Sequence, residues 1–257
     1  MNYLPEKIIR EIAQRRNKYI PFFTVVTDFG SGHCTWFQGM VDKMYVASDR
    51  IRKLAKKRGA KVKDENLVMS GLPIRSDFAD NAEKMGCRTT EEGKAYRKNM
   101  KSTLGLDPEK KVILLMGGGE GVGSLGAIAE QLYLELRETG VDASICVVCG
   151  RNNQLKDEFQ TKDWNAFHAA KMKNGQHISK RSKIVKFIKG KGRKANKTLN
   201  SYSSNEALRE GDVNVVGLGF MSNMAEYMVA SDILVSKAGP GTIAEAASVG
   251  LPIMLTR

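Results

Sequence analysis

The chain has 257 residues, enough for one large domain or two of ordinary size, each with its own core. Hydrophobic residues make up 42% of the sequence, as in globular proteins, and no apolar run is long enough to predict a membrane span. The four cysteines are too few for a disulfide scaffold. Most of the net charge of +13 is local: residues 171–197 hold eleven Lys or Arg and no acid, and without them the chain has 30 basic and 28 acidic residues.

The first half of the chain predicts short strands alternating with helices. Residues 1–18 interleave charges with Ile8, Ile9 and Ile12, which indicates an amphipathic helix rather than a signal peptide. Strands are expected at residues 22–27, 44–47 and 67–69, and helices at 49–59, capped by Ser48, and at 89–104. Residues 77–90 have few apolar side chains and are predicted to separate two units.

The second half repeats the alternation. Strands are expected at 112–116, 145–149, 213–218, 233–236 and 252–255, with helices between most of them. Strands that alternate with helices indicate parallel sheets covered on both faces. We therefore predict an α/β fold with two domains, residues 1–85 and residues 86–257. Because no helix follows the last strand, the sequence is expected to be incomplete at this end.

A basic insertion at about 162–211 interrupts this second series. Its length and weak apolar content predict a solvated, disordered loop. The alternative is that its positive charges attract anionic lipid headgroups, at about 1 kcal/mol for each Lys or Arg near the surface. A nucleic-acid site is disfavoured, because such a site interleaves aromatic residues with the charges and Phe187 is the only aromatic residue in 171–197.

Cys146 and Cys149 have the spacing of a metal or redox pair but lie in a predicted strand. Residues three apart on a strand point to opposite faces, so one metal ion could not easily bind both. We predict two core cysteines and no metal site.

Two glycine turns each follow a predicted strand. Residues 117–123 lack the Lys-Ser/Thr pair of a P-loop, and a role in ligand binding and a role in packing both remain open. Residues 237–245 combine a strand end, Gly239, Gly241 and a helix start that Thr242 is expected to cap. Amides at a helix start suit a diphosphate, and Glu245 could accept hydrogen bonds from sugar hydroxyls. The plain alternative for Glu245 is an exposed acid near a helix start.

Two side chains in the first half are further candidates. Arg75, after a predicted strand end, could pair with a phosphate through two N–H groups, although a single arginine is more often a solvated surface residue. His33 lies in a loop beside Trp36 and is a candidate acid, base or hydrogen-bond donor.

Several motifs occur in a fixed order along the chain. They are Thr24-Val-Val-Thr-Asp28, His33-Cys-Thr-Trp-Phe37, Gly71-Leu-Pro-Ile-Arg75, Leu114-Leu-Met-Gly-Gly-Gly-Glu-Gly121, Cys149-Gly-Arg-Asn152, Gly219-Phe220 and the run from Lys237 to Pro252. Together they resemble the monogalactosyldiacylglycerol synthases, which are related to the bacterial enzyme that adds N-acetylglucosamine to lipid I.

This resemblance implies a GT-B glycosyltransferase, with two Rossmann-like domains facing across a cleft. It implies transfer of galactose from UDP-galactose to 1,2-diacylglycerol with inversion, making galactolipid at the plastid (chloroplast) envelope membrane without a spanning segment. No metal ion or cofactor is implied at the diphosphate. The residues that match the UDP-sugar site are Arg75, Gly241, Thr242, Ile243, Ala244 and Glu245, and His33 is a weak catalytic candidate.

The chain departs from the family pattern in three places. A Gly-Gly-Gly-His loop, which carries the main catalytic histidine of the family, is absent, and so is a Gln-Glu-Ala-Gly-Asn segment after Leu255. Cys34 stands where the family has proline. We therefore expect a fragment that lacks activity by itself. A related lipid glycosyltransferase that uses UDP-glucose or UDP-N-acetylglucosamine is the alternative function.

Overall fold

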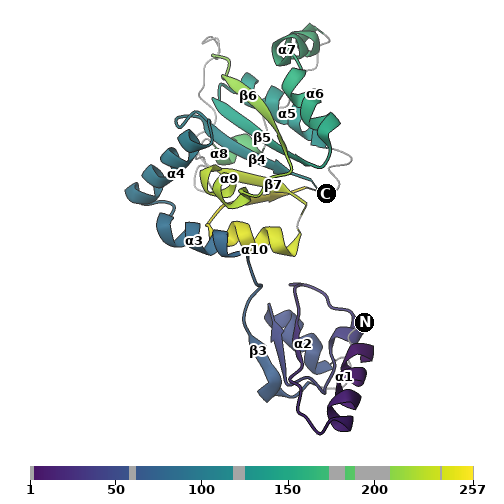
Figure 1. The fold of residues 1–257 in the computed structure, drawn as a ribbon. Coiled ribbons are helices and arrows are strands. Elements are labelled where there is room, and N and C mark those ends of the chain that lie inside the picture. The colour runs from purple at the N-terminus through teal and green to yellow at the C-terminus, as the bar shows by residue number, and fades with distance from the viewer. Residues whose placement is uncertain are drawn as a thin grey trace, which may run out of the picture. The chain divides into compact units, whose positions relative to one another are not determined.

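The computed structural model describes residues 3–57, 62–117, 125–173, 183–188, 209–237 and 239–256 (Figure 1). They form two compact units, Met1–Arg75 with Pro240–Ala244 and Ser76–Gly239 with Glu245–Arg257. None of the described helices is both long and apolar enough to cross a bilayer.

The first unit contains a small parallel sheet. Its strands β1 (Phe23–Val25), β2 (Lys43–Val46) and β3 (Leu67–Met69) pair in that order. The other elements are α1 (Tyr3–Arg15), α2 (Asp49–Lys57) and the short 3-10 helices η1 (Cys34–Trp36) and η2 (Asp64–Asn66). The predicted cap of α2 is confirmed, because the Ser48 hydroxyl accepts a hydrogen bond from the amide of Ile51 at 3.2 Å. Met44, Val46 and Ile51 lie in the core of this unit.

The second unit contains five parallel strands in the order β6-β5-β4-β7-β8. Their bounds are β4 (Lys111–Met116), β5 (Ala143–Gly150), β6 (Val213–Gly219), β7 (Ile233–Ser236) and β8 (Ile253–Leu255). The helices are α3 (Ser76–Met85), α4 (Glu91–Thr103), α5 (Leu125–Glu138), α6 (Asn153–Thr161), α7 (Trp164–Lys173), α8 (Lys183–Ile188) and α9 (Met224–Ala230), followed by α10 (Pro240–Ser248), whose first five residues group with the first unit. The predicted α/β class with two parallel sheets is confirmed.

Residues 77–90, which were expected to separate the two units, contain most of helix α3. Their polar composition hides two apolar positions, Phe78 and Met85, that lie seven residues apart on one helix face and are buried. Since α3 contacts α9, it groups with the second unit, and the compact units divide between Arg75 and Ser76. The domain limits at residues 85 and 86 stay a prediction.

The described part of the region from 162 to 211 is more ordered than predicted. Helices α7 and α8 lie within it, and Ile184 of α8 is buried in the same cluster as Ile145 and Val147 of β5. Trp164 of α7 packs against that cluster and stacks on the ring of Phe159, 6.2 Å between centroids. The remainder of the insertion, residues 174–182 and 189–208, lies outside the described residues.

Cys146 and Cys149 are buried in β5, as predicted. Cys149 belongs to the cluster that contains Ile145 and Val147, and the alternation of a strand turns Cys146 to the opposite face. Burial raises the pKa of the Cys146 thiol to about 12 and that of Cys149 to about 11, so both are inert thiols at neutral pH.

Candidate functional site

The two glycine turns follow neighbouring strands. Strand β4 ends at Met116 and β7 ends at Ser236, and these two residues are partners in the parallel register. The chain runs from β4 outward to β5 and β6, then returns to the other side of β4 as β7. The sheet therefore reverses its order between β4 and β7, and ligands of open α/β sheets bind outside the carboxyl ends of strands at this point. Most of the first turn, residues 118–124, lies outside the described residues.

Helix α10 begins two residues earlier than predicted, and this corrects the role given to Thr242. Gly239 is the N-cap residue, and Pro240 occupies the first turn, where its fixed φ angle suits a helix start. Thr242 lies inside the first turn and is not the cap. The N-cap residue Gly239 has no side chain that could cap α10, and the helical pattern leaves the amides of Gly241 and Thr242 without intrahelical acceptors. These amides and the positive end of the helix dipole can bind an anion.

The predicted UDP-sugar residues from Gly241 to Glu245 share the first half of α10. Gly241 is exposed, whereas Thr242, Ile243, Ala244 and Glu245 are half-buried. Glu245 lies one helical turn after Gly241, on the same side of the helix. A carboxylate therefore stands one turn below the open amides, and the helix presents both to one region of space.

Two glycines of these turns differ in what surrounds them. A Cβ at Gly117 would lie 2.8 Å from Cδ1 of Leu125, so packing against α5 explains this glycine. A Cβ at Gly241 would have no atom within 4 Å. Packing within the described part of the chain therefore does not require a glycine at position 241, which leaves close approach of a ligand as its explanation.

The remaining predicted site residues lie in the first unit. Arg75 is exposed and ends the segment after β3, in which Gly71 adopts φ +74°. His33 is exposed and is the N-cap residue of η1, and its Nδ1 accepts a hydrogen bond from the amide of Thr35 at 3.4 Å. The same Nδ1 lies 2.8 Å from Oγ1 of Thr35, a contact in which donor and acceptor depend on the tautomer, so either ring nitrogen can carry the proton of a neutral His33. The roles of Arg75 and His33 remain predictions.

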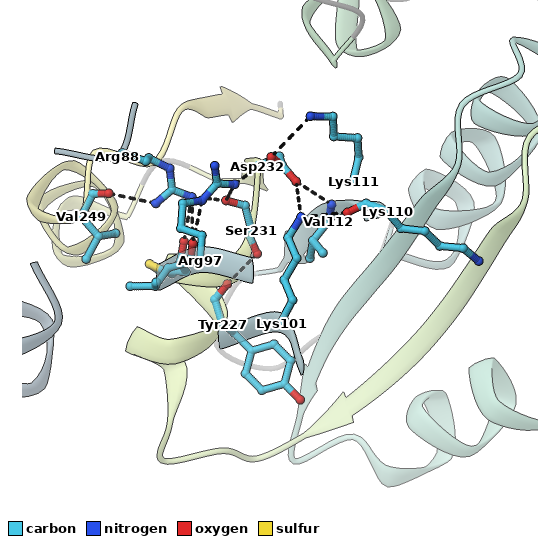
Figure 2. Close-up of polar contacts among 12 residues, drawn as sticks. Arg88, Arg97, Lys101, Lys110, Lys111, Val112, Tyr227, Ser231, Asp232 and Val249 are labelled. Atoms are coloured by element: carbon cyan, nitrogen blue, oxygen red, sulfur yellow. Dashed lines mark hydrogen bonds and ion pairs between the residues drawn. The ribbon is translucent and has the colours of Figure 1, made fainter. Parts of the chain in front are cut away.

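A dense ionic network lies at the opposite, amino-terminal edge of the second sheet (Figure 2). Asp232, just before β7, accepts hydrogen bonds from Arg97 Nη2 at 2.7 Å, Lys101 Nζ at 3.2 Å and the amide of Val112 at 2.9 Å. Burial raises the pKa of Asp232, but the charges of Lys101 and Arg97 lower it more, so the carboxyl is ionised at neutral pH. This network joins α4 to the starts of β4 and β7.

Arg88 extends the network to the end of α9. It donates to the carbonyl oxygens of Val229 at 3.1 Å and Val249 at 3.0 Å, and to that of Ser231. Burial and the nearby Arg97 lower the pKa of Arg88 to about 9. Cations at a helix C-terminus satisfy its free carbonyls and oppose its dipole, so this network consolidates the fold. The sequence analysis missed it, although Asp232 between two apolar runs is a visible signal.

Within the described residues, no cluster of three or more His, Cys, Asp or Glu side chains could hold a metal ion.

Two family models match the chain. The monogalactosyldiacylglycerol (MGDG) synthase model matches residues 3–74, and the glycosyltransferase family 28 C-terminal domain matches residues 166–256. The second match includes α10.

Curated relatives match along nearly the whole chain. A probable monogalactosyldiacylglycerol synthase 2, chloroplastic, of Oryza sativa subsp. indica is 31% identical over 259 residues, covering 99% of this chain and 42% of the relative. Monogalactosyldiacylglycerol synthase 1, chloroplastic, of Arabidopsis thaliana is 29% identical, with coverage of 99% and 37%. The chain thus spans about two fifths of the length of these relatives.

Solved structures give weaker similarity. MurG of Acinetobacter baumannii is 14% identical with a TM-score of 0.43, covering 92% of this chain and 46% of MurG. A glycosyltransferase of Rickettsia africae is 13% identical with a TM-score of 0.44, covering 98% of this chain and 61% of that one. The family models and curated relatives confirm the resemblance that the motifs predicted: this chain is similar in sequence to the monogalactosyldiacylglycerol synthases along nearly its whole length.

Proposed function

We propose that this chain is the donor-binding part of a glycosyltransferase that moves galactose from UDP-galactose to 1,2-diacylglycerol with inversion, making monogalactosyldiacylglycerol. The observation that carries the proposal is the open start of α10 at the point where the sheet reverses its order. Its amides, Gly241 and Glu245 provide what a sugar nucleotide requires: donors for the diphosphate, room for it, and a carboxylate for hydroxyl groups.

The start of α10 would also favour the chemical step. The oxygen of the acceptor hydroxyl bonds to the anomeric carbon while the bond from that carbon to the diphosphate breaks, and the electron pair stays on UDP. A single displacement of this kind inverts the anomeric carbon. The amides of Gly241 and Thr242 would donate to the diphosphate as its negative charge grows, and such fixed donors contribute most where charge develops. No metal ion or cofactor is part of the proposal.

His33 and Arg75 have supporting roles in this proposal. The imidazole ring of His33 can donate a hydrogen bond to an oxygen of the sugar, or accept the proton that the acceptor hydroxyl loses. The planar guanidinium of Arg75 can pair with a phosphate through two N–H groups. Both assignments rest on the family motifs that contain these residues.

The acceptor places the protein at a membrane surface, and α8 supports contact with one. Ile184 and Ile188 attach α8 to the core, while Phe187 is 49% exposed in the middle of the basic stretch 171–197. A fixed helix with an outward aromatic ring, in a stretch of the sequence that is rich in lysine, suits the interface of an anionic bilayer. We propose peripheral attachment to the plastid envelope, with anionic lipids as partners of this stretch and no nucleic acid as partner.

The proposal is tested in two steps. Isothermal titration calorimetry on this chain should show binding of UDP and UDP-galactose, and weaker binding to E245A, whereas absence of UDP binding would refute the proposal. The longest protein that the gene encodes is then incubated with labelled UDP-galactose and vesicles that contain diacylglycerol. Labelled galactolipid is expected, and transfer from UDP-glucose or UDP-N-acetylglucosamine alone would instead favour the related lipid glycosyltransferase.

Vesicle flotation tests the membrane contact. The intact chain should float with vesicles that contain anionic lipid and less with neutral vesicles, and deletion of residues 171–197 should abolish the difference. Equal flotation of the intact chain with both vesicle types would refute a role for the basic stretch.

A further inference from the structure

Arg88 joins the C-terminal ends of α9 and α10 through a single guanidinium group (Figure 2). Its Nη1 donates to the carbonyl oxygen of Val249, the C-cap residue of α10, at 3.0 Å. Its Nη2 donates to carbonyl oxygens at the end of α9, those of Met228 at 3.3 Å, Val229 at 3.1 Å and Ser231. Because the nitrogens of a planar guanidinium are held at a fixed separation, this side chain sets the position of one helix end relative to the other.

Helix α10 buries little surface of its own. Of its nine residues, all of which the structure describes, only Ala246 is buried. After the helix, the amides of Gly250 and Leu251 donate to carbonyl oxygens of α10 itself, so these bonds do not attach it to another element. The hydrogen bond from Arg88 to Val249 instead ties the end of α10 to the loop between α3 and α4.

The loop that carries Arg88 is itself firmly held. The carbonyl oxygen of Cys87 accepts hydrogen bonds from the amide of Thr90 at 3.2 Å and from its hydroxyl at 3.0 Å. A Cβ at Gly93 would lie 3.2 Å from Cα of Arg88, so the first turn of α4 is in direct contact with this loop. Arg88 therefore extends from a rigid backbone, and its hydrogen bonds resist a movement of α10.

We propose that Arg88 is a positioning residue of the donor site, which keeps the phosphate-binding start of α10 in place by fixing the end of that helix. The proposal rests on the proposed function, because it assumes that the diphosphate binds at α10. With nine residues, α10 is about 13 Å long and moves as one body, so a shift of its end displaces its start. The amides of Gly241 and Thr242 bind a phosphate well only at about 2.7–3.2 Å, and a small displacement weakens both bonds.

The test measures the affinity for UDP by calorimetry on the intact chain. R88M keeps the aliphatic stem and removes the donors, and it should weaken UDP binding about 10-fold, the effect of losing one hydrogen bond to a charged group. R88K keeps a positive charge, but its single nitrogen cannot occupy both positions of the fork, so it should also weaken UDP binding. Circular dichroism shows which variants are folded, and R88K decides the question if R88M does not fold.

Arg97 supplies the matched control. It is also a half-buried arginine of the same network, and it donates to Val229 at 3.2 Å and Ser231 at 3.1 Å, at the end of α9 rather than of α10. R97M and R97K should lower the melting temperature, as the Arg88 variants do, and should bind UDP as the parent does. A residue that acts on stability alone would change unfolding without changing the affinity of the folded protein.

Nuclear magnetic resonance gives a second readout that needs no ligand. The amide signals of Gly241 and Thr242 should shift in R88K and stay in place in R97K, and unchanged signals in R88K would contradict the proposal. If R88K binds UDP as tightly as the parent, or R97K weakens UDP binding to the same extent, the positioning role is overturned while the proposed function stands. If the parent itself does not bind UDP, the proposed function fails, and this proposal fails with it.

Discussion

Replacing Gly241 by alanine tests whether this glycine is needed for ligand binding or for the stability of the fold. A Cβ at this position has no atom within 4 Å, and the residue lies in the first turn of α10. Alanine favours a helix over glycine by about 0.5–1 kcal/mol. We therefore expect G241A to raise the free energy of unfolding by up to this amount, which corresponds to roughly 2–4 °C in the melting temperature of a chain of this size.

The same methyl group would occupy the space that a bound phosphate needs beside the amides of Gly241 and Thr242. A hydrogen bond to a charged group contributes about 1.5–3 kcal/mol, so the loss of one should weaken UDP binding roughly 10- to 100-fold. Calorimetry with UDP and urea unfolding measure the two effects on one preparation. The control is A247G, an exposed position of the same helix, which should lower stability and leave UDP binding unchanged. A G241A variant that is more stable and binds UDP normally would refute the ligand explanation.

Three further predictions concern the support of the second sheet. D232N leaves buried cations without their counter-charge and should cost about 3–5 kcal/mol in urea unfolding, whereas D212N, which breaks an exposed pair with Lys110, should cost about 1 kcal/mol or less. The pKa of Asp232 is lowered in the folded state, so its stabilising effect is complete above its ordinary pKa and is lost as the pH falls through the folded pKa. The free energies of unfolding of the parent and of D232N should therefore converge below about pH 4. A difference that stays constant with pH would contradict this. G217A places a methyl 2.6 Å from a backbone oxygen of Lys156 and should cost about 1–3 kcal/mol, and unchanged thermal unfolding would show that the two elements can separate.

Strand positions could be predicted from the sequence because apolar runs of β-branched residues, bounded by glycine and polar residues, leave few alternatives. Leu67–Met69 is recovered at its full length, and the start of α2 is recovered because Ser48 caps it. Helix α3 was missed for the opposite reason. Two buried side chains, Phe78 and Met85, are enough to hold it, and two positions in ten residues give no clear period.

The sequence predicted where the glycine turn before α10 lies, but not the helix cap or the hydrogen-bond partners of the individual side chains. The start of α10 was placed two residues late because the cap was sought in a hydroxyl, although Pro240 at the first position was the better signal. The contacts of the His33 ring with the amide and the hydroxyl of Thr35 are likewise not revealed by spacing. The partners of Asp232 lie more than a hundred residues away in the sequence, so no local pattern could have predicted them.

The two edges of the second sheet differ in how their polar groups are satisfied. At the amino-terminal edge, Asp232 is paired with cations, and Arg88 binds the free carbonyls of α9. At the carboxyl-terminal edge, the first amides of α10 have no side-chain cap, and Phe220 exposes most of its ring. Each of these features would be removed by an ordinary stabilising substitution, a serine cap or a polar residue for the phenylalanine. Their presence on one edge, opposite an edge where Asp232 and Arg88 are paired, indicates that the carboxyl-terminal edge is shaped for a bound ligand rather than for stability.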